Sequence, residues 1–135
     1  MKKIIFLFFC ALCFGKQSRA QFAQTADKVF SKVEVEASFP GGDAAWKEYL
    51  LKNLRANVPV KKKAPAGIYK VVVRFIVSVD GSLTDIEAET DFGYGMEDEV
   101  IRIIKKGPQW IPAMINGKPV NAYRRQPVTF EITER

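Results

Sequence analysis

The sequence predicts an α+β domain, in which a small antiparallel sheet carries two helices on one face. Two segments have the period of a helix, at residues 44–54 and 96–106, and two have the alternation of a strand, at residues 68–79 and 120–132. With residues 83–90 as a returning strand, the order is helix, strand, strand, helix, strand. This order is typical of a sheet whose helices gather on one side.

The first helix is predicted from apolar side chains that recur at helical spacing, at Trp46, Tyr49, Leu50 and Leu54. Asp43 precedes it as the natural N-cap, because its carboxylate can accept a hydrogen bond from a free N–H group of the first turn. Pro59 excludes a continuation, since proline has no N–H and clashes with the preceding turn. The basic stretch 60–67 is predicted as a loop, and residues 32–38 as a short strand or an extended arm.

The segment at residues 68–79 has the strongest strand signal. One face carries Tyr69, Val71, Val73, Phe75, Val77 and Val79. Asp80 and Gly81 follow with the chemistry of a hairpin turn, so the next strand returns antiparallel to this one. The last strand contains Pro127, which cannot donate a ladder hydrogen bond, and this indicates an edge strand.

The first twenty residues have the three parts of a secretory signal peptide. Two lysines form the basic start, residues 4–15 are apolar or small, and a polar stretch ends at Ala20, after which cleavage is predicted. A retained membrane anchor is excluded by length, because twelve helical residues span about 18 Å and the hydrocarbon core is about 30 Å thick. A lipoprotein modified at Cys13 ranks below cleavage, since the bulky Leu12 precedes that cysteine.

Removal of this segment changes the bulk properties of the chain. It contains both cysteines, four of the 21 basic residues and no acidic residue, so 17 basic and 15 acidic residues remain, a net charge of +2 instead of +6. A net charge of +2 gives no support to nucleic-acid binding. We expect a periplasmic protein of about 115 residues, with no stable membrane span after cleavage.

Catalysis and metal binding are both unexpected for the mature chain, which has neither histidine nor cysteine. The usual zinc and copper sites are therefore excluded, and so is the commonest general base. The sequence also has no GxSxG motif, no P-loop and no EF-hand spacing. We expect no enzymatic activity, no catalytic residue, no metal and no cofactor.

Five short motifs follow one another along the chain. Their residues include Phe39, Pro40, Gly41 and Gly42, then Asp80 and Gly81, Trp110 and Pro112, Asn116 and Gly117, and finally Pro127 and Phe130. Together they resemble the C-terminal domain of the TonB energy transducer, in the form common in Bacteroidota. The resemblance covers roughly residues 33–132. Each motif also has a structural interpretation: the glycines permit turns, and Trp110 is expected in the core because large aromatic side chains dominate small cores.

The resemblance implies a mode of binding. In that family the domain captures the TonB box of an outer-membrane transporter, which adds as a strand to the last strand of the domain. The implied peptide-binding edge consists of Tyr123, Arg124, Arg125, Gln126, Val128, Phe130 and Ile132. Arg124 and Arg125 are expected beside the peptide, and an equal alternative is that they protect a bare edge from aggregation. The implied partner is an outer-membrane TonB-dependent receptor or another envelope protein.

The predicted organisation is a signal peptide at residues 1–20, a flexible leader at residues 21–32 and a TonB C-terminal-like domain at residues 33–135. A full transducer also has an inner-membrane helix and a Pro-rich spacer, and the chain resembles only its last part. We therefore expect a soluble binding domain that does not transmit energy alone. Two alternative functions stay open: a structural, peptidoglycan-associated or regulatory module of the envelope, and a cryptic enzyme that would use acids such as Asp80, Asp85 and Asp91, although aspartate is expected in such turns in any case. A homodimer formed through the last strand is also open.

Overall fold

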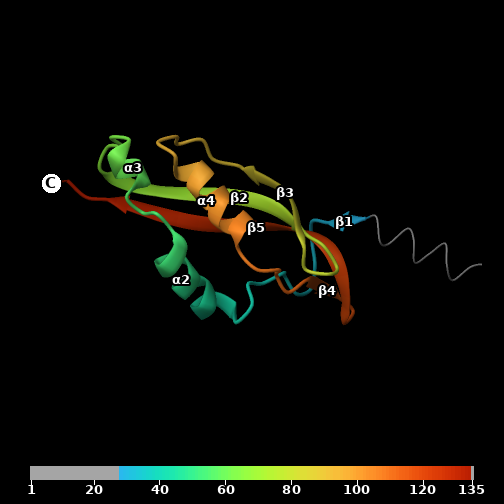
Figure 1. The fold of residues 1–135 in the computed structure, drawn as a ribbon. Helices are drawn as coiled ribbons and strands as arrows, with labels where there is room; N and C mark the ends of the chain where they lie inside the picture. Colours follow the sequence, from blue (N-terminus) through green and yellow to red (C-terminus); the bar gives the residue numbers. More distant parts are fainter. Residues whose placement is uncertain (1–27, 135) are drawn as a thin grey trace, which may run out of the picture.

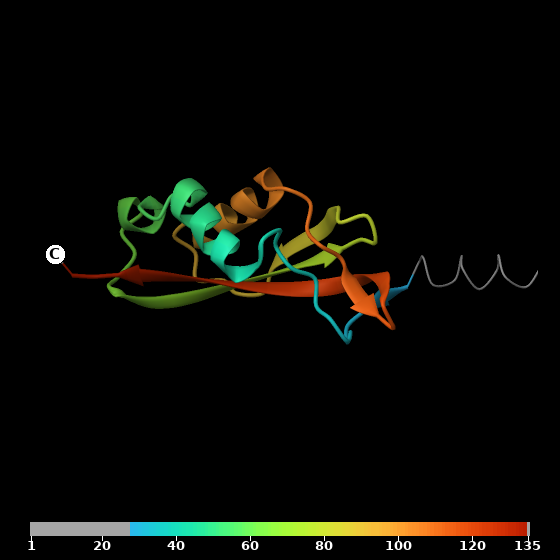
Figure 2. The same cartoon turned by 90° about the horizontal axis from the view of Figure 1, so that it is seen from below.

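The computed structural model describes residues 28–134, which form a sheet covered on one side by helices (Figure 1, Figure 2). Strands β1, β5, β2 and β3 lie side by side in that order, and β4 pairs with the start of β5. The elements are β1 (Val29–Phe30), α2 (Gly42–Asn53), α3 (Val58–Lys61), β2 (Gly67–Val77), β3 (Leu83–Ala88), α4 (Met96–Lys106), β4 (Ala113–Ile115) and β5 (Lys118–Ile132). The predicted α+β class is confirmed.

The antiparallel pair of β2 and β5 forms the centre of the sheet. All of β2 pairs with residues 122–132 of β5. Side chains alternate between the two faces of a strand, so every second one points to the helices. The buried ones are Val71, Val73, Phe75 and Val77 of β2 and Ala122, Val128, Phe130 and Ile132 of β5. The alternation predicted for β2 is correct up to Val77, whereas Val79 lies in the following loop and is exposed.

The two longer helices lie side by side in one layer. Helix α4 begins and ends at the predicted residues, and it packs on β2 and β3. Acidic residues occupy its first turn and lysines its last, which suits the helix dipole. Helix α2 is joined to it by three hydrogen bonds, one of which is donated by the Lys106 ammonium to the side-chain oxygen of Asn53 (3.4 Å). The Tyr49 hydroxyl donates to the carbonyl of Ile103 (2.7 Å), and the Arg102 guanidinium donates to the carbonyl of Asn53 (2.9 Å).

An aromatic cluster joins the start of α2 to the sheet. Trp110 is 4% exposed, and its ring centroid lies 5.0 Å from that of Phe75 and 5.8 Å from that of Phe39. The Trp46 ring lies 5.3 Å from Phe39 and 5.7 Å from Trp110. Such aromatic pairs each stabilise a core by about 0.5–1.5 kcal/mol beyond the area that they bury. The prediction that Trp110 belongs to the core is confirmed.

Helix α2 begins earlier than predicted, and the prediction that Asp43 is its N-cap is wrong. The N-cap is Gly41, with a φ of 88° and no side-chain hydrogen bond. A tight turn replaces the expected cap, because the N–H of Gly42 donates to the carbonyl of Phe39 (2.8 Å). The predicted basic loop also begins inside a short helix, α3. Proline is tolerated in a first helical turn, so Pro59 can stand at the start of α3.

The predicted antiparallel sheet also contains one parallel pair, so the sheet is mixed. Strand β1 runs parallel to β5, with Val29 beside Asn121 and Phe30 beside Ala122. These two residues of β1 come from the segment predicted as a flexible leader, and the half-buried Phe30 packs on the core. After β1 the chain continues as an extended arm with isolated bridges to residues 111 and 114. The predicted signal peptide and residues 21–27 of the leader lie outside the described residues.

Two of the five sequence motifs meet in the fold. The N–H of Trp110 donates to the carbonyl of Gly81 (2.9 Å). Gly81 has a φ of 86°, and a Cβ at this residue would lie only 2.3 Å from the carbonyl oxygen of Trp110. Glycine is therefore required both by the backbone conformation and by the close approach of the Trp110 segment.

We predict that Gly81→Ala destabilises the domain by about 2–4 kcal/mol, because a steric clash adds to the strain of a positive φ. Gly117→Ala is the matched control. Gly117 has a φ of 72°, but no atom lies within 4 Å of the position of its Cβ, so a loss of about 1–2 kcal/mol is expected. Urea unfolding measures both free energies. Equal losses would contradict the importance of the Trp110 contact.

Candidate functional site at the outer side of β5

One side of β5 has no strand partner over most of its length. Its inner side pairs with β2 from Ala122 to Ile132, whereas on its outer side β1 pairs only with Asn121 and Ala122. Within residues 28–134, no strand pairs with the outer side of residues 123–132. We call this outer side of residues 123–132 the open edge. Its backbone groups are available to form a ladder with an added strand.

The direction of the backbone at the open edge follows from the hydrogen bonds of Val72. Its N–H donates to the hydroxyl of Thr90 (3.3 Å) and its carbonyl accepts from the N–H of Glu89 (2.8 Å), so both groups point toward β3. Val72 is paired with Pro127 on its other side. The backbone of Pro127 therefore points away from β2, into the open edge. Its missing N–H thus removes no hydrogen bond from the sheet.

The same alternation selects the residues that offer hydrogen bonds at the open edge. Both the N–H and the C=O point outward at Arg125, Thr129 and Glu131, and the C=O points outward at Tyr123 and Pro127. The outward N–H of Tyr123 is already engaged by the parallel pairing of Phe30 with Ala122. The side-chain amide of Gln126 donates to the Pro127 carbonyl (3.3 Å). The middle of the open edge is thus partly covered by a side chain of the same strand, and the positions on either side of it are the ones ready to pair.

The seven residues that the sequence predicted for this site divide between the two faces of the sheet. Arg124, Gln126, Val128, Phe130 and Ile132 face the helices, and all of them are buried except the half-buried Arg124. Tyr123 and Arg125 lie on the outer face and are exposed. The structure therefore brings the backbone of these residues to one edge but separates their side chains.

Arg124 is held on the helix side by three neighbours. Its guanidinium donates to the carboxylate of Glu36 and to the amide oxygen of Gln126 (3.1 Å), and it lies 5.9 Å from the ring centroid of Trp110. The side chain is 21% exposed. Arg124 thus ties the extended arm to β5 through its two terminal nitrogens, whereas its buried Nε has no hydrogen-bond partner among the described residues.

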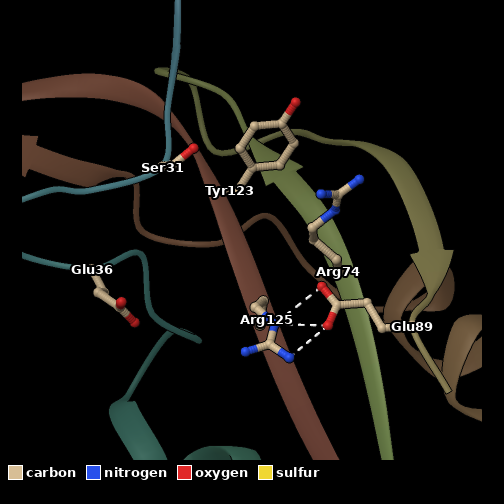
Figure 3. Close-up of a pocket in the computed structure, with 6 residues that line it drawn as sticks. All are labelled: Ser31, Glu36, Arg74, Glu89, Tyr123 and Arg125. Atoms are coloured by element: carbon tan, nitrogen blue, oxygen red, sulfur yellow. Dashed lines mark hydrogen bonds and ion pairs between the residues drawn. The ribbon is translucent and has the colours of Figure 1, made fainter.

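Arg125 lies on the outer face, where it helps to line a groove of about 480 Å³ (Figure 3). The other residues that line this outer groove are Ser31, Glu36, Arg74, Glu89 and Tyr123. Arg125 donates to both carboxylate oxygens of Glu89 at 2.6 to 3.0 Å. The guanidinium of Arg74 lies 4.9 Å from the ring centroid of Tyr123. A polar groove with charges of both signs therefore borders one end of the open edge.

Reasoning from the sequence missed most of the outer groove. Ser31, Glu36, Arg74 and Glu89 come from three distant segments, and only the arm and the sheet register bring them together. Arg74 carries the one available signal, because it is a charged residue within the most strongly predicted strand. That signal places Arg74 on the exposed face of the sheet but does not identify its neighbours.

The buried acidic groups have structural partners. Glu99 accepts hydrogen bonds from Arg102 (2.6 Å) and from the N–H of Arg55 (2.9 Å). Burial raises the pKa of Glu99, but these hydrogen bonds and the arginine charges outweigh it, so the pKa is lowered. Glu97 accepts from the N–H of Gly93 (2.8 Å). Among residues 28–134, no cluster of His, Cys, Asp or Glu could hold a metal ion, and no helix is long and apolar enough to cross a membrane.

Comparison with known proteins identifies a family that matches the second half of the chain. Residues 69–132 match the family described as Gram-negative bacterial TonB protein C-terminal. The matched segment begins in β2 and ends at the last residue of β5, so it contains the open edge and excludes β1 and α2. No curated protein and no solved structure matches the chain.

We predict that Arg125→Gln raises the pKa of Glu89. The hydrogen bonds from Arg125, followed by the charges of Arg125 and Arg74, hold the pKa of Glu89 below its ordinary value. The ion pair therefore favours the folded state above the ordinary glutamate pKa, and this contribution is lost as the pH falls through the lowered value. An NMR titration of the Glu89 carboxyl carbon measures the change. Lys52→Gln, which removes the exposed pair with Glu48, should leave the Glu89 titration unaltered.

Proposed function

We propose that the chain captures the TonB-box peptide of an outer-membrane transporter. Residues 69–132 match the TonB C-terminal domain family, which supports a TonB-like protein-interaction domain. The peptide adds as a strand to the open edge of β5. Its backbone pairs with the outward N–H and C=O groups, in the manner of other peptides that extend a sheet. The domain thereby takes part in TonB-dependent transport as a binding module.

The open edge is the observation that carries this proposal. Ten consecutive residues of β5, from Tyr123 to Ile132, are paired on one side with β2 and have no strand partner on the other among the described residues. Such an edge attracts any extended chain, so a soluble protein normally shortens or covers it. A long edge that is left open is best explained by a strand that binds there.

Export to the periplasm is the second part of the proposal. The first twenty residues have the pattern of a cleaved signal peptide, and the binding domain follows them. N-terminal sequencing of the protein from the periplasmic fraction should therefore begin at Gln21. A membrane-bound product that begins at Met1 would contradict release into the periplasm, while leaving the assignment of the binding edge intact.

Titration of the isotopically labelled protein with a panel of synthetic TonB-box peptides tests the binding mode. We take these peptides from the transporters of the same organism. Chemical-shift changes should concentrate on the amides of Arg125, Thr129 and Glu131, because these N–H groups gain hydrogen bonds. If no peptide changes these amides, peptide capture at β5 is wrong, and a structural role in the envelope becomes the better interpretation.

We predict that Thr129→Pro weakens peptide binding about twofold to twelvefold. The substitution removes one outward N–H, and a hydrogen bond is worth about 0.5–1.5 kcal/mol. It removes no hydrogen bond to β2. Thr129 lies two residues after Pro127, so its N–H also points away from β2. Isothermal titration calorimetry with the same peptides measures the affinity. Thr129→Val keeps the N–H and should bind like the original chain; equal weakening by both substitutions would mean that the side chain, not the backbone, is responsible.

A further inference from the structure

Helix α2 extends past the outer side of β5. In Figure 1 it lies on the side of β5 away from β2, and Figure 2 shows it in the same layer as α4, on the helix side of the sheet. Helix α4 packs on β2 and β3 instead. A strand that pairs with the open edge would therefore lie in the sheet layer beneath α2, and every second side chain of that strand would point toward this helix.

The side chains of α2 that face this space can be identified from the helical period. Tyr49 and Asn53 face α4, to which they are hydrogen bonded. Leu50 follows Tyr49 by about 100° around the helix axis, and like Leu54 it is half-buried against the core. Leu51 follows by a further 100° and is 87% exposed. An apolar stripe thus turns from the sheet side of α2 toward the side away from α4.

This stripe lines a groove of about 350 Å³, which we call the α2 groove. Its residues are Lys47, Leu50, Leu51, Leu54 and Ala56. The salt bridge on α2 joins Glu48 to Lys52 on the other side of the helix (2.9 Å). Lys47 takes part in none of the ion pairs found within residues 28–134. The α2 groove is thus apolar, with one unmatched positive charge at its rim.

We propose that the α2 groove binds the helix-side residues of the peptide that adds to the open edge, and that it selects an apolar side chain with an acidic neighbour. This inference rests on the proposed function and adds the chemistry of the peptide. An apolar side chain would remove the exposed surface of Leu51 from water. A carboxylate two residues away, on the same face of the peptide, would meet the charge of Lys47. The side chains between them would face the polar outer groove.

A second copy of the chain fits the α2 groove less well than a single peptide strand. Antiparallel pairing of two β5 strands would bring both α2 helices above the same junction, where they would compete for one space. Parallel pairing of two β5 strands would place the twofold axis along the strands, and this symmetry inverts the second sheet. The outer face of one copy would then lie on the same side as the α2 groove of the other. That face carries the charged Arg125 and Glu131, which do not suit an apolar surface.

Variants of Leu51 test the inference with the tightest-binding peptide of the TonB-box panel. Leu51→Gln should weaken binding about tenfold, because the peptide loses an apolar contact. Leu51→Met keeps the apolar contact and should stay within about threefold of the original affinity. Ile68→Gln is the control, since Ile68 is 73% exposed on β2 and away from the open edge; its affinity should not change. Lys47→Gln should weaken binding a few-fold at low salt and not at high salt.

A serine scan of the same peptide then identifies the contacts. Each serine variant is titrated against both the original chain and Leu51→Gln. Peptide positions that contact Leu51 should weaken binding to the original chain but not to Leu51→Gln. These positions should recur at every second residue, since one face of an added strand points to α2. If Leu51→Gln binds normally while Thr129→Pro weakens binding, strand addition stands and the α2 groove is not used. A third outcome is that Leu51→Gln weakens binding, Thr129→Pro does not, and the serine scan shows no two-residue period. In that case the peptide does not add to β5, and both proposals are wrong.

Discussion

The pairing of β2 with β5 determines most of what this domain presents to a partner. It occupies all eleven residues of β2 and the inner side of residues 122–132 of β5. Because backbone groups alternate along a strand, this one pairing decides which N–H groups point outward, and it places Pro127 where no donor is needed. It also decides which side chains of β5 support the helices and which lie on the outer face. The helices and the aromatic cluster then complete the core on one side only.

Elements whose signals are local could be predicted from the sequence. Helix α4 has its apolar period, its acidic first turn and its terminal glycine within a dozen residues, so both of its ends were predicted. Helix α2 began elsewhere because a glycine turn at Gly41 and Gly42 replaced the side-chain cap for which Asp43 appeared suited. Strand β1 could not be predicted, since two residues carry no period and are ordered only by their distant partner in β5.

The candidate site was harder to predict than the fold, because most of its contacts join residues that are distant in the sequence. The sequence indicated the last strand, but it led us to expect Arg124 and Arg125 together beside the peptide, whereas they lie on opposite faces of the sheet. The partners of these arginines could not be predicted, because Glu36 and Glu89 are distant in sequence and neither forms a motif with β5. The α2 groove was also missed. The predicted apolar face of this helix included Leu50 and Leu54 but not Leu51, which is exposed because the helix lies past the last strand.

The different chemistry of the two sides of the open edge has a consequence for alignment. Backbone pairing alone tolerates slippage, since every shift of an added chain restores a similar set of hydrogen bonds. A slip by one residue, however, exchanges the two faces of that chain. Its apolar side chains would then meet the ion pair of Arg125 and Glu89, and its polar side chains would meet the leucines of α2. A chain held between two such different surfaces would therefore have a defined register as well as a defined position. A bare sheet edge cannot define the register in this way.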